Sequence, residues 1–260
     1  MSGRWICVAA AMLPLLSCSV KEERGECPCH LRLSFGAEWT GNVSVSAWDA
    51  EGCVFCMGDV LKDAVDGVAE YDVVRGRYTL CVSQLDSGSG SDGRAVIRRG
   101  SQADSLYAWA SGAIDTDREN LDVRPSRNKQ FATIYLSITS RSEMDYNIIV
   151  SGGVNGLDLR TLEPIAGEFA CRAVKDDGWY YRFRLPRQPM EAVGDGLSLE
   201  VYSGSDLISE FPLGEEIMSA GYDWSAESLQ DIYVDVDMNQ VRLSVGVGDW
   251  EDGGENAYKI

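Results

Sequence analysis

Cysteine and histidine are the side chains of this sequence whose chemistry could serve catalysis or metal binding. The 260 residues include eight cysteines but a single histidine, His30. Hydrolase triads and catalytic zinc sites need at least one well-placed imidazole and usually more. His30 follows Cys29 in an alternating segment, so the two side chains are expected on opposite faces of a strand. No pair among the 41 acidic residues is singled out for hydrolysis either, and we predict that the protein is not an enzyme.

Cys18 is the cysteine for which the sequence predicts a definite covalent modification. Residues 1–17 carry one charge, Arg4, and an apolar run over 5–16 that is too short to span a bilayer and is typical of a secretory signal. The run ends in Leu15-Leu16-Ser17-Cys18, which resembles a bacterial lipobox. The alternative is an ordinary signal peptide that leaves Cys18 as a free thiol. We predict lipidation of Cys18, because several acyl chains on one residue give stable membrane attachment.

Residues 18–28 are polar and are expected to form a tether that holds the folded part away from the membrane. Within this tether, Lys21-Glu22-Glu23 resembles the export signal of Bacteroidota surface lipoproteins. The resemblance implies an outer-membrane protein that faces the cell exterior. The alternative is a solvated spacer that faces the periplasm.

Six further cysteines follow Cys7 and Cys18: Cys27, Cys29, Cys53, Cys56, Cys81 and Cys171. An even number in an exported chain is typical of disulfides, and such cysteines also occur as buried free thiols. Four of them, in Cys27-Pro28-Cys29 and Cys53-x-x-Cys56, could ligate zinc, although the first spacing fits a tetrahedral site poorly. We predict disulfides or buried thiols and no metal, and the spacing does not tell which cysteines would pair.

The charge of the chain restricts its partners. Lysine and arginine number 23 against 41 acidic residues, which gives a formal net charge of −18. A surface this negative repels nucleic acids and anionic lipid headgroups. We therefore predict no nucleic-acid partner and membrane contact through the lipid anchor alone. The hydrophobic fraction of 45% is enough for a folded core.

Two short motifs resemble cofactor and cation sites but lack required features. Gly88, Gly90 and Gly93 match a dinucleotide-binding spacing, yet no helix of sufficient length follows them, and a mobile hairpin loop explains them more simply. The segment 115–126 begins like a calcium-binding loop, but Asn120 and Ser126 occupy the positions that need Gly and Glu. We predict no cofactor.

Apolar side chains alternate with a period of two residues along most of the chain, which predicts strands. The expected strands cover 29–35, 43–47, 77–83, 95–98, 131–139, 146–151, 169–174, 179–185, 197–203, 207–213, 231–238 and 241–247. The last two should form a hairpin, turned by Asn239-Gln240, with one apolar and one acidic face. Helices are expected to be few and short, at 105–110 and 225–229.

This pattern predicts an all-β fold with two tandem antiparallel β-sandwich domains. Pro125-Ser126-Arg127-Asn128 interrupts the alternation between them. We place the signal peptide at 1–17, the tether at 18–28, the N-terminal sandwich at 29–127 and the C-terminal sandwich at 128–260.

A lipobox cysteine, a polar tether and Cys27-Pro28-Cys29 leading into the strand 30–35 resemble the fimbrillin-associated anchor lipoprotein family of Bacteroidales fimbriae. Asp104-Ser105-Leu106-Tyr107 and the ending at 245–250 are similar in looser ways. The resemblance implies two transthyretin-like sandwiches and no catalysis. It further implies a fimbrial anchor or accessory subunit at the cell surface, which attaches a stalk and limits its length, with the stalk subunits as partners.

The alternative function is a glycan-binding surface lipoprotein. Such a protein would present aromatic rings on a sheet face or at loop tips. Trp39, Trp109 and Trp224 lie near expected loops and could form such a platform. Aromatic residues at turns more often fold back onto the core, so their exposure decides between the two interpretations.

Overall fold

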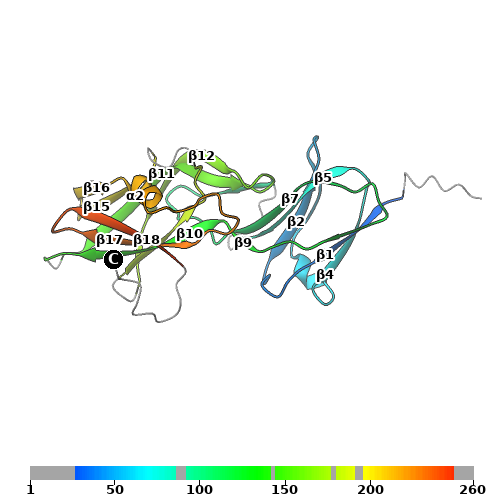
Figure 1. The fold of residues 1–260 in the computed structure, drawn as a ribbon, viewed down its shortest axis with the longest axis horizontal. Helices are drawn as coiled ribbons and strands as arrows, with labels where there is room; N and C mark the ends of the chain where they lie inside the picture. The colour runs from blue at the N-terminus through cyan, green and yellow to red at the C-terminus, as the bar shows by residue number, and fades with distance from the viewer. Residues whose placement is uncertain (1–26, 86–91, 142–143, 177–179, 191–195, 249–260) are drawn as a thin grey trace, which may run out of the picture.

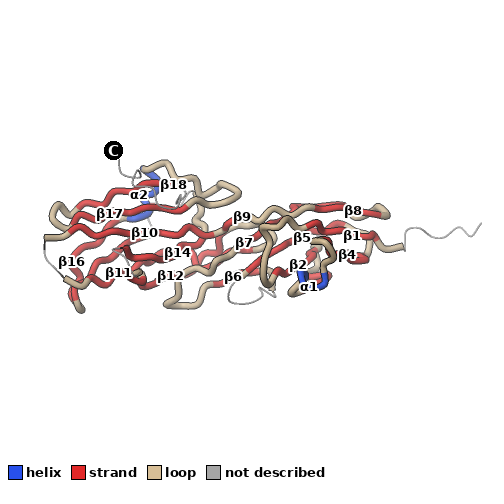
Figure 2. Tube along the Cα trace, turned by 90° about the horizontal axis from the view of Figure 1, so that it is seen from below, coloured by secondary structure: helices blue, strands red, loops and turns tan. Residues whose placement is uncertain are grey.

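The structure is a computed structural model in which residues 27–85, 92–141, 144–176, 180–190 and 196–248 are described. These residues form eighteen strands and two short helices. Figures 1 and 2 show an elongated molecule in which two β-sandwiches lie end to end. The prediction of an all-β sandwich fold is confirmed. No helix among the described residues has the length and apolar character needed to cross a membrane.

The N-terminal sandwich is built from two sheets. One has the strand order β4-β1-β8 and the other the order β3-β2-β5-β7-β9. The strands are β1 (Cys29–Ser34), β2 (Val43–Trp48), β3 (Cys53–Met57), β4 (Val68–Val73), β5 (Arg77–Gln84), β7 (Tyr107–Asp115), β8 (Asn120–Val123) and β9 (Asn128–Lys129), with the helix α1 (Val60–Asp63). Alternate residues of β1 and β2 point inward, and Leu31, Leu33, Val43 and Val45 are completely buried between the sheets.

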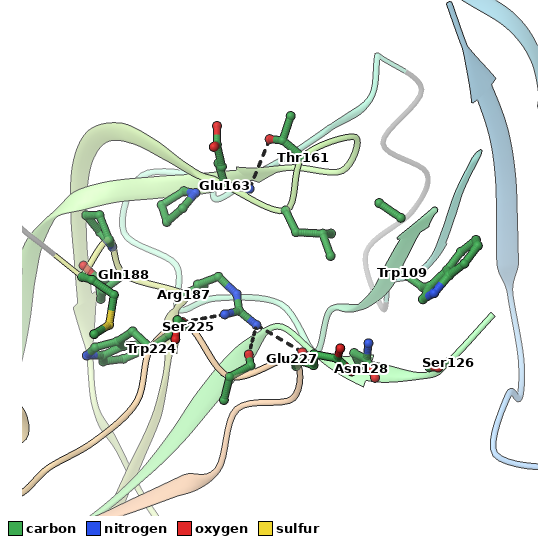
Figure 3. A pocket seen from close by; sticks show the side chains of 16 residues that line it. Trp109, Ser126, Asn128, Thr161, Glu163, Arg187, Gln188, Trp224, Ser225 and Glu227 are labelled. Carbon is green, nitrogen blue, oxygen red and sulfur yellow. Dashed lines mark hydrogen bonds between the residues drawn. The ribbon is translucent and has the colours of Figure 1, made fainter. Parts of the chain in front are cut away.

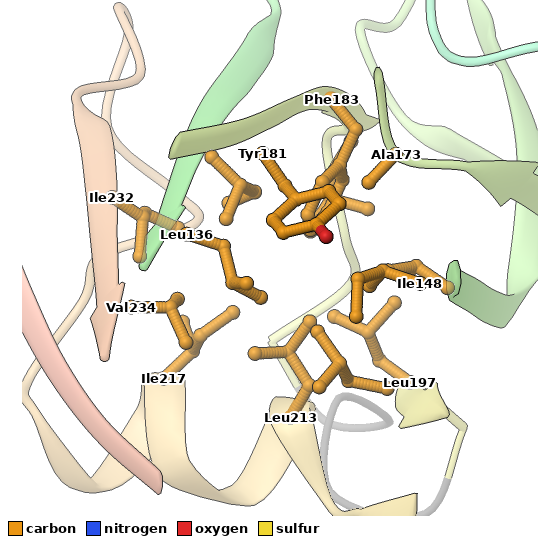
Figure 4. Close-up of a cluster of buried hydrophobic side chains, with 14 of the residues drawn as sticks. Leu136, Ile148, Ala173, Tyr181, Phe183, Leu197, Leu213, Ile217, Ile232 and Val234 are labelled. Carbon is orange, nitrogen blue, oxygen red and sulfur yellow. The ribbon is translucent and has the colours of Figure 1, made fainter. Parts of the chain in front are cut away.

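The C-terminal sandwich has the larger core. Its sheets have the orders β13-β14-β10-β17-β18 and β12-β11-β15-β16, and β6 adds to the second by pairing with β11. The elements are β6 (Arg94–Val96), β10 (Phe131–Thr139), β11 (Tyr146–Asp158), β12 (Pro164–Arg172), β13 (Val174–Lys175), β14 (Tyr180–Pro186), β15 (Ser198–Ser203), β16 (Asp206–Phe211), α2 (Leu213–Ser219), β17 (Asp231–Asp237) and β18 (Arg242–Gly248). Figure 4 shows Leu213 and Ile217 of α2 pointing into this core beside Leu136 and Val234.

Most strand pairs are antiparallel, and the expected hairpin of β17 and β18 is present with Val234 opposite Val245. Burial alternates strictly along β17, so its apolar and acidic side chains occupy opposite faces. Two pairs, β1 with β8 and β10 with β17, are parallel. Both parallel pairs join strands that are far apart in sequence, which leaves enough chain for the crossover connection that parallel strands need.

The prediction of helices at 105–110 and 225–229 is wrong. Residues 107–115 form β7, which pairs with β5 and β9, and residues 225–229 are turns. Pairing on both sides of Tyr107 and Ala108 overrides the weak local helix preference of this stretch. The helix α2 replaces the end of the strand expected at 207–213, because Pro212 ends β16 and the following apolar residues are spaced for a helix.

Segments from each half cross at the middle of the molecule, where Figure 2 places β6, β7 and β9. Strand β6 pairs with β11, and β9 pairs with β7 and leads through Gln130 into β10. An apolar cluster of Leu106, Ala108, Leu157 and Leu159 lies between these strands. Strand β6, from before the predicted boundary between residues 127 and 128, pairs with β11 from after it. The boundary itself stays a prediction.

Candidate functional site

The predicted lipid attachment residue, Cys18, lies outside the described residues, as do the signal peptide and the tether up to residue 26. The described chain starts at Cys27, and β1 starts at Cys29. In both overall views β1 lies in the sandwich that is remote from β16. Lipidation of Cys18 therefore stays a prediction, and so do the membrane and its leaflet.

The six remaining cysteines divide into two environments. Cys29, Cys81 and Cys171 are buried, whereas Cys27, Cys53 and Cys56 are exposed, and all six are free thiols. Burial raises the pKa of Cys81 and of Cys171 to about 12, so both stay protonated and unreactive at neutral pH. Within the described ranges, no group of three or more His, Cys, Asp or Glu side chains is arranged to hold a metal ion.

His30 lies on the outer face of β1, while the neighbouring Cys29 is completely buried. Its Nδ1 atom is 3.1 Å from Oδ1 of Asp72, and its Nε2 atom is 3.7 Å from Oε2 of Glu70. The Nε–H of Arg32 donates to the other oxygen of Glu70 at 3.0 Å. The imidazole is thus part of a surface network of polar and charged side chains and is separated from the Cys29 thiol by the sheet.

The residues of the two weak motifs have local structural roles. Asp117 pairs with Arg75 at 3.4 Å, and its backbone N–H donates to Oδ1 of Asp115 at 2.8 Å, which is a loop-stabilising arrangement. Gly93 has φ of +73° and lies against the Trp48 ring, where any side chain would collide. Residues 86–91, which include Gly88 and Gly90, lie outside the described ranges.

The three tryptophans do not form an exposed platform, which corrects that expectation. Trp39 is 4% exposed, and its indole N–H donates to the Pro125 carbonyl at 3.1 Å. Trp224 is 1% exposed and packs edge-on against Tyr222 with ring centroids 4.6 Å apart. Trp109 is half-buried against the N-terminal core. Trp39 and Trp224 cover the apolar interior beside loops, whereas Trp109 belongs to strand β7. The two buried rings fold back because removing so much apolar area from water is favourable.

A cleft of about 470 Å³ is present where the two sandwiches meet (Figure 3). Its walls come from five parts of the chain: Trp109 and its neighbour on β7, the stretch around Asn128, the β11–β12 loop with Glu163, the segment 187–190 after β14, and the loop 224–227 before β17. This volume falls within the range of small-molecule binding pockets, and amide, carboxylate and hydroxyl groups surround it.

Arg187 forms the floor of this cleft in Figure 3 and is 7% exposed. Its Nε–H donates to Oε1 of Gln130 at 2.9 Å, and the two terminal nitrogens donate to carbonyls of the loop 224–227. Gln130 in turn donates from Nε2 to the carbonyls of Ala108, Asn128 and Glu227. Burial lowers the pKa of Arg187, because the neutral carbonyls around it replace water incompletely.

The arrangement around Arg187 binds the 224–227 loop to the start of β10. Four acceptors receive hydrogen bonds from one guanidinium, and a planar fork suits this better than an ammonium group. The sequence did not single out Arg187 or Gln130, because neither belongs to a motif and their partners are distant in sequence. Neither residue is placed as an acid, base or nucleophile, and their hydrogen bonds give both a structural role at the cleft.

Comparison with solved structures finds the same fold in several proteins. The fimbrial anchor protein Mfa2 from Porphyromonas gingivalis matches with a TM-score of 0.57 at 14% identity, covering 86% of this chain and 98% of that one. A candidate polysaccharide-binding protein from Bacteroides thetaiotaomicron matches with a TM-score of 0.58 at 12% identity, covering 88% and 100%. A candidate adhesin from the same organism matches with a TM-score of 0.56 at 14% identity, covering 86% and 97%.

These matches are below 25% identity and establish a shared fold. No family model matches the sequence. No curated protein matches it either. The names of the structural neighbours associate this fold with adhesion and binding, and one of them with fimbrial anchoring.

Proposed function

We propose that the protein is an outer-membrane surface lipoprotein that acts as a fimbrial anchor or accessory subunit, attaches a fimbrial stalk and limits its length. The shared fold with the anchor protein Mfa2 supports this role, because it extends over 98% of that chain. The motif ending at Cys18 supports attachment by lipid, and no catalytic step is part of the role. Stalk subunits are the proposed partners.

The position of the N-terminus supports an orientation for the anchor. Strand β1 follows the tether and lies in the sandwich remote from β16. A lipid on Cys18 would therefore hold the N-terminal sandwich near the membrane and direct the C-terminal sandwich outward. The outward sandwich carries two exposed apolar side chains, Leu207 at 51% and Ile208 at 42%, on the edge strand β16. We place the contact with the stalk on this outer sandwich.

Replacing the lipidated residue tests the anchor. In the Cys18→Ala variant we expect the protein to leave the outer membrane and appear in the soluble fraction, because the lipid on Cys18 is the proposed means of attachment. Membrane fractionation with a high-salt wash measures this, and shed fimbriae in the culture medium measure the loss of anchoring. Cys27→Ala is the matched control, since Cys27 is an exposed thiol of the same N-terminal region. Retention of the Cys18→Ala protein in the membrane after the wash would contradict the proposal.

The cleft supports a second candidate function, the binding of a glycan. Its walls combine the side chains of Asn128, Glu163 and Gln188 with Trp109, and these are the amide, carboxylate and aromatic groups that recognise sugar hydroxyls and ring faces. The name of one structural neighbour as a candidate polysaccharide-binding protein agrees with this function.

A glycan array tests this second candidate. If the cleft binds a glycan, Glu163→Gln should weaken binding by about tenfold or more, because an exposed carboxylate acceptor at the cleft is lost. Glu168→Gln is the matched control, because Glu168 is exposed on β12 and does not line the cleft. An array without any bound glycan, or equal loss in both variants, would remove the cleft from consideration.

A further inference from the structure

Cys53 and Cys56 are two exposed thiols on one short strand. Their strand, β3, is at the edge of its sheet and pairs with β2 alone. Four of its five residues are exposed, and Phe55 is the one that packs toward the core. The strand can therefore adjust locally without disturbing the interior of the sandwich.

A β-bulge brings these two cysteines to the same face. A separation of three residues places side chains on opposite faces of a regular strand. Here Cys56 lies opposite Ser46 and Cys53 lies opposite Trp48, because the register shifts between Ala47 and Trp48. Ser46 and Trp48 are two residues apart and share the outer face, so Cys53 and Cys56 share it as well.

The Cys53 sulfur lies close to the peptide bond that precedes Cys56. Its Sγ atom donates to the Phe55 carbonyl oxygen at 3.2 Å, and this carbonyl belongs to the peptide bond that joins Phe55 to Cys56. Partial burial raises the pKa of Cys53, and the negative charge of an ionised Cys56 raises it further.

Cys81 is the third cysteine on this face of the sheet. It lies on β5 opposite Ser46, so β2 separates it from Cys56, and it is buried with a pKa of about 12. Two strand spacings are too long for a disulfide without backbone movement. Among the described cysteines, Cys53 and Cys56 are the two that share one face of one strand and are both open to solvent.

We propose that Cys53 and Cys56 form an exposed dithiol that closes into a disulfide across the bulge of β3. The oxidant is a small-molecule disulfide. The thiolate of one cysteine attacks a sulfur of this oxidant, forms a mixed disulfide and releases one thiolate. The second cysteine, after losing its proton, attacks the protein sulfur of the mixed disulfide and displaces the other thiolate. Two protein thiols become one disulfide while one oxidant molecule is reduced to two thiols.

Closure would fix the edge strand β3 in its bulged form. A bulged edge is a poor template for pairing with another strand, because the bulge bends the strand and disrupts its regular hydrogen-bond pattern. The disulfide would therefore protect an edge that carries Val54 at 41% and Met57 at 44% exposure. This site would respond to the redox state of its surroundings without changing either core.

Peptide mass spectrometry after incubation of the full chain with oxidised glutathione tests the proposal. Trypsin cleaves after Arg32 and Lys62, and the peptide 33–62 contains Cys53 and Cys56 as its only cysteines. We expect this peptide to become lighter by two hydrogen atoms and to resist alkylation by iodoacetamide until it is reduced. The Cys56→Ser variant should instead retain one glutathione on Cys53, because the resolving thiol is missing.

Cys27→Ser is the matched control, since it removes an exposed thiol from another segment and should leave closure unchanged. Several results would overturn the proposal: a peptide that keeps two alkylatable thiols, a peptide with glutathione on both cysteines, or a reducible dimer linked through this peptide. Each would show that the two sulfurs do not reach one another.

Discussion

At the scale of single residues, Arg187 and Gln130 connect the chain segments that line the cleft through hydrogen bonds. Arg187 is almost fully buried, and no carboxylate lies within salt-bridge distance of it among the described residues. Its charge is stabilised by Gln130 and by the carbonyls of the loop 224–227. Removing a donor from several buried acceptors costs more than a single hydrogen bond contributes, because each acceptor is left without a partner.

We therefore expect Arg187→Met to lower the free energy of unfolding by about 2–3 kcal/mol. Arg187→Lys should recover a part of this loss, because an ammonium group keeps the charge but cannot reach all four acceptors. Urea unfolding measures both variants. Arg172→Met, at an exposed position on β12, is the control and should change stability by about 0.5 kcal/mol or less. Equal midpoints for the two methionine variants would mean that water in the cleft replaces the guanidinium.

At the scale of elements, the sequence predicts a strand correctly where apolar and polar side chains alternate regularly. The prediction fails where contacts with distant segments determine the secondary structure. The hairpin of β17 and β18 could be predicted, because Ile232, Val234 and Val236 alternate with acidic residues and are buried. The helix α2 was missed because its apolar residues, Leu213, Ile217 and Met218, lie in a segment too short to show a clear helical period.

Strand β11 was predicted to end at residue 151, yet it continues to Asp158. Gly152, Gly153 and Gly156 interrupt its alternation, and this is the part that pairs with β6. The pairing depends on close approach, since a Cβ atom at Gly156 would lie 2.6 Å from the Ala95 carbonyl oxygen. The cleft could not be predicted from the sequence either. Its walls come from segments that are far apart in sequence and meet only in the folded chain, so no local pattern indicates it.

At the scale of the whole molecule, the contacts at the middle join the two sandwiches into one elongated body. Arg160, from the β11–β12 loop, lies over the Trp48 ring of the N-terminal sandwich at 5.4 Å and is held by Asp158 through two hydrogen bonds. The crossing of β6 and the apolar cluster around Leu157 add to this contact. The proposed role as an anchor between a lipid and a stalk would require such a joint, because a flexible one would let the outer sandwich reorient freely.

Gly156→Ala tests whether the β6–β11 pairing makes this joint rigid. The added methyl group must displace the backbone of Ala95, so we expect a loss of about 1–3 kcal/mol in stability together with detachment of β6. Amide hydrogen exchange should increase at Ile97, whose N–H donates to the Asn155 carbonyl at 2.7 Å, and small-angle scattering should show a broader range of molecular lengths. Gly153→Ala is the matched control on the same strand, because no atom lies within 4 Å of its Cβ position. If both variants kept the exchange rates and the scattering profile of the parent protein, the rigidity of the joint would have to come from the contacts of Arg160 and the apolar cluster instead.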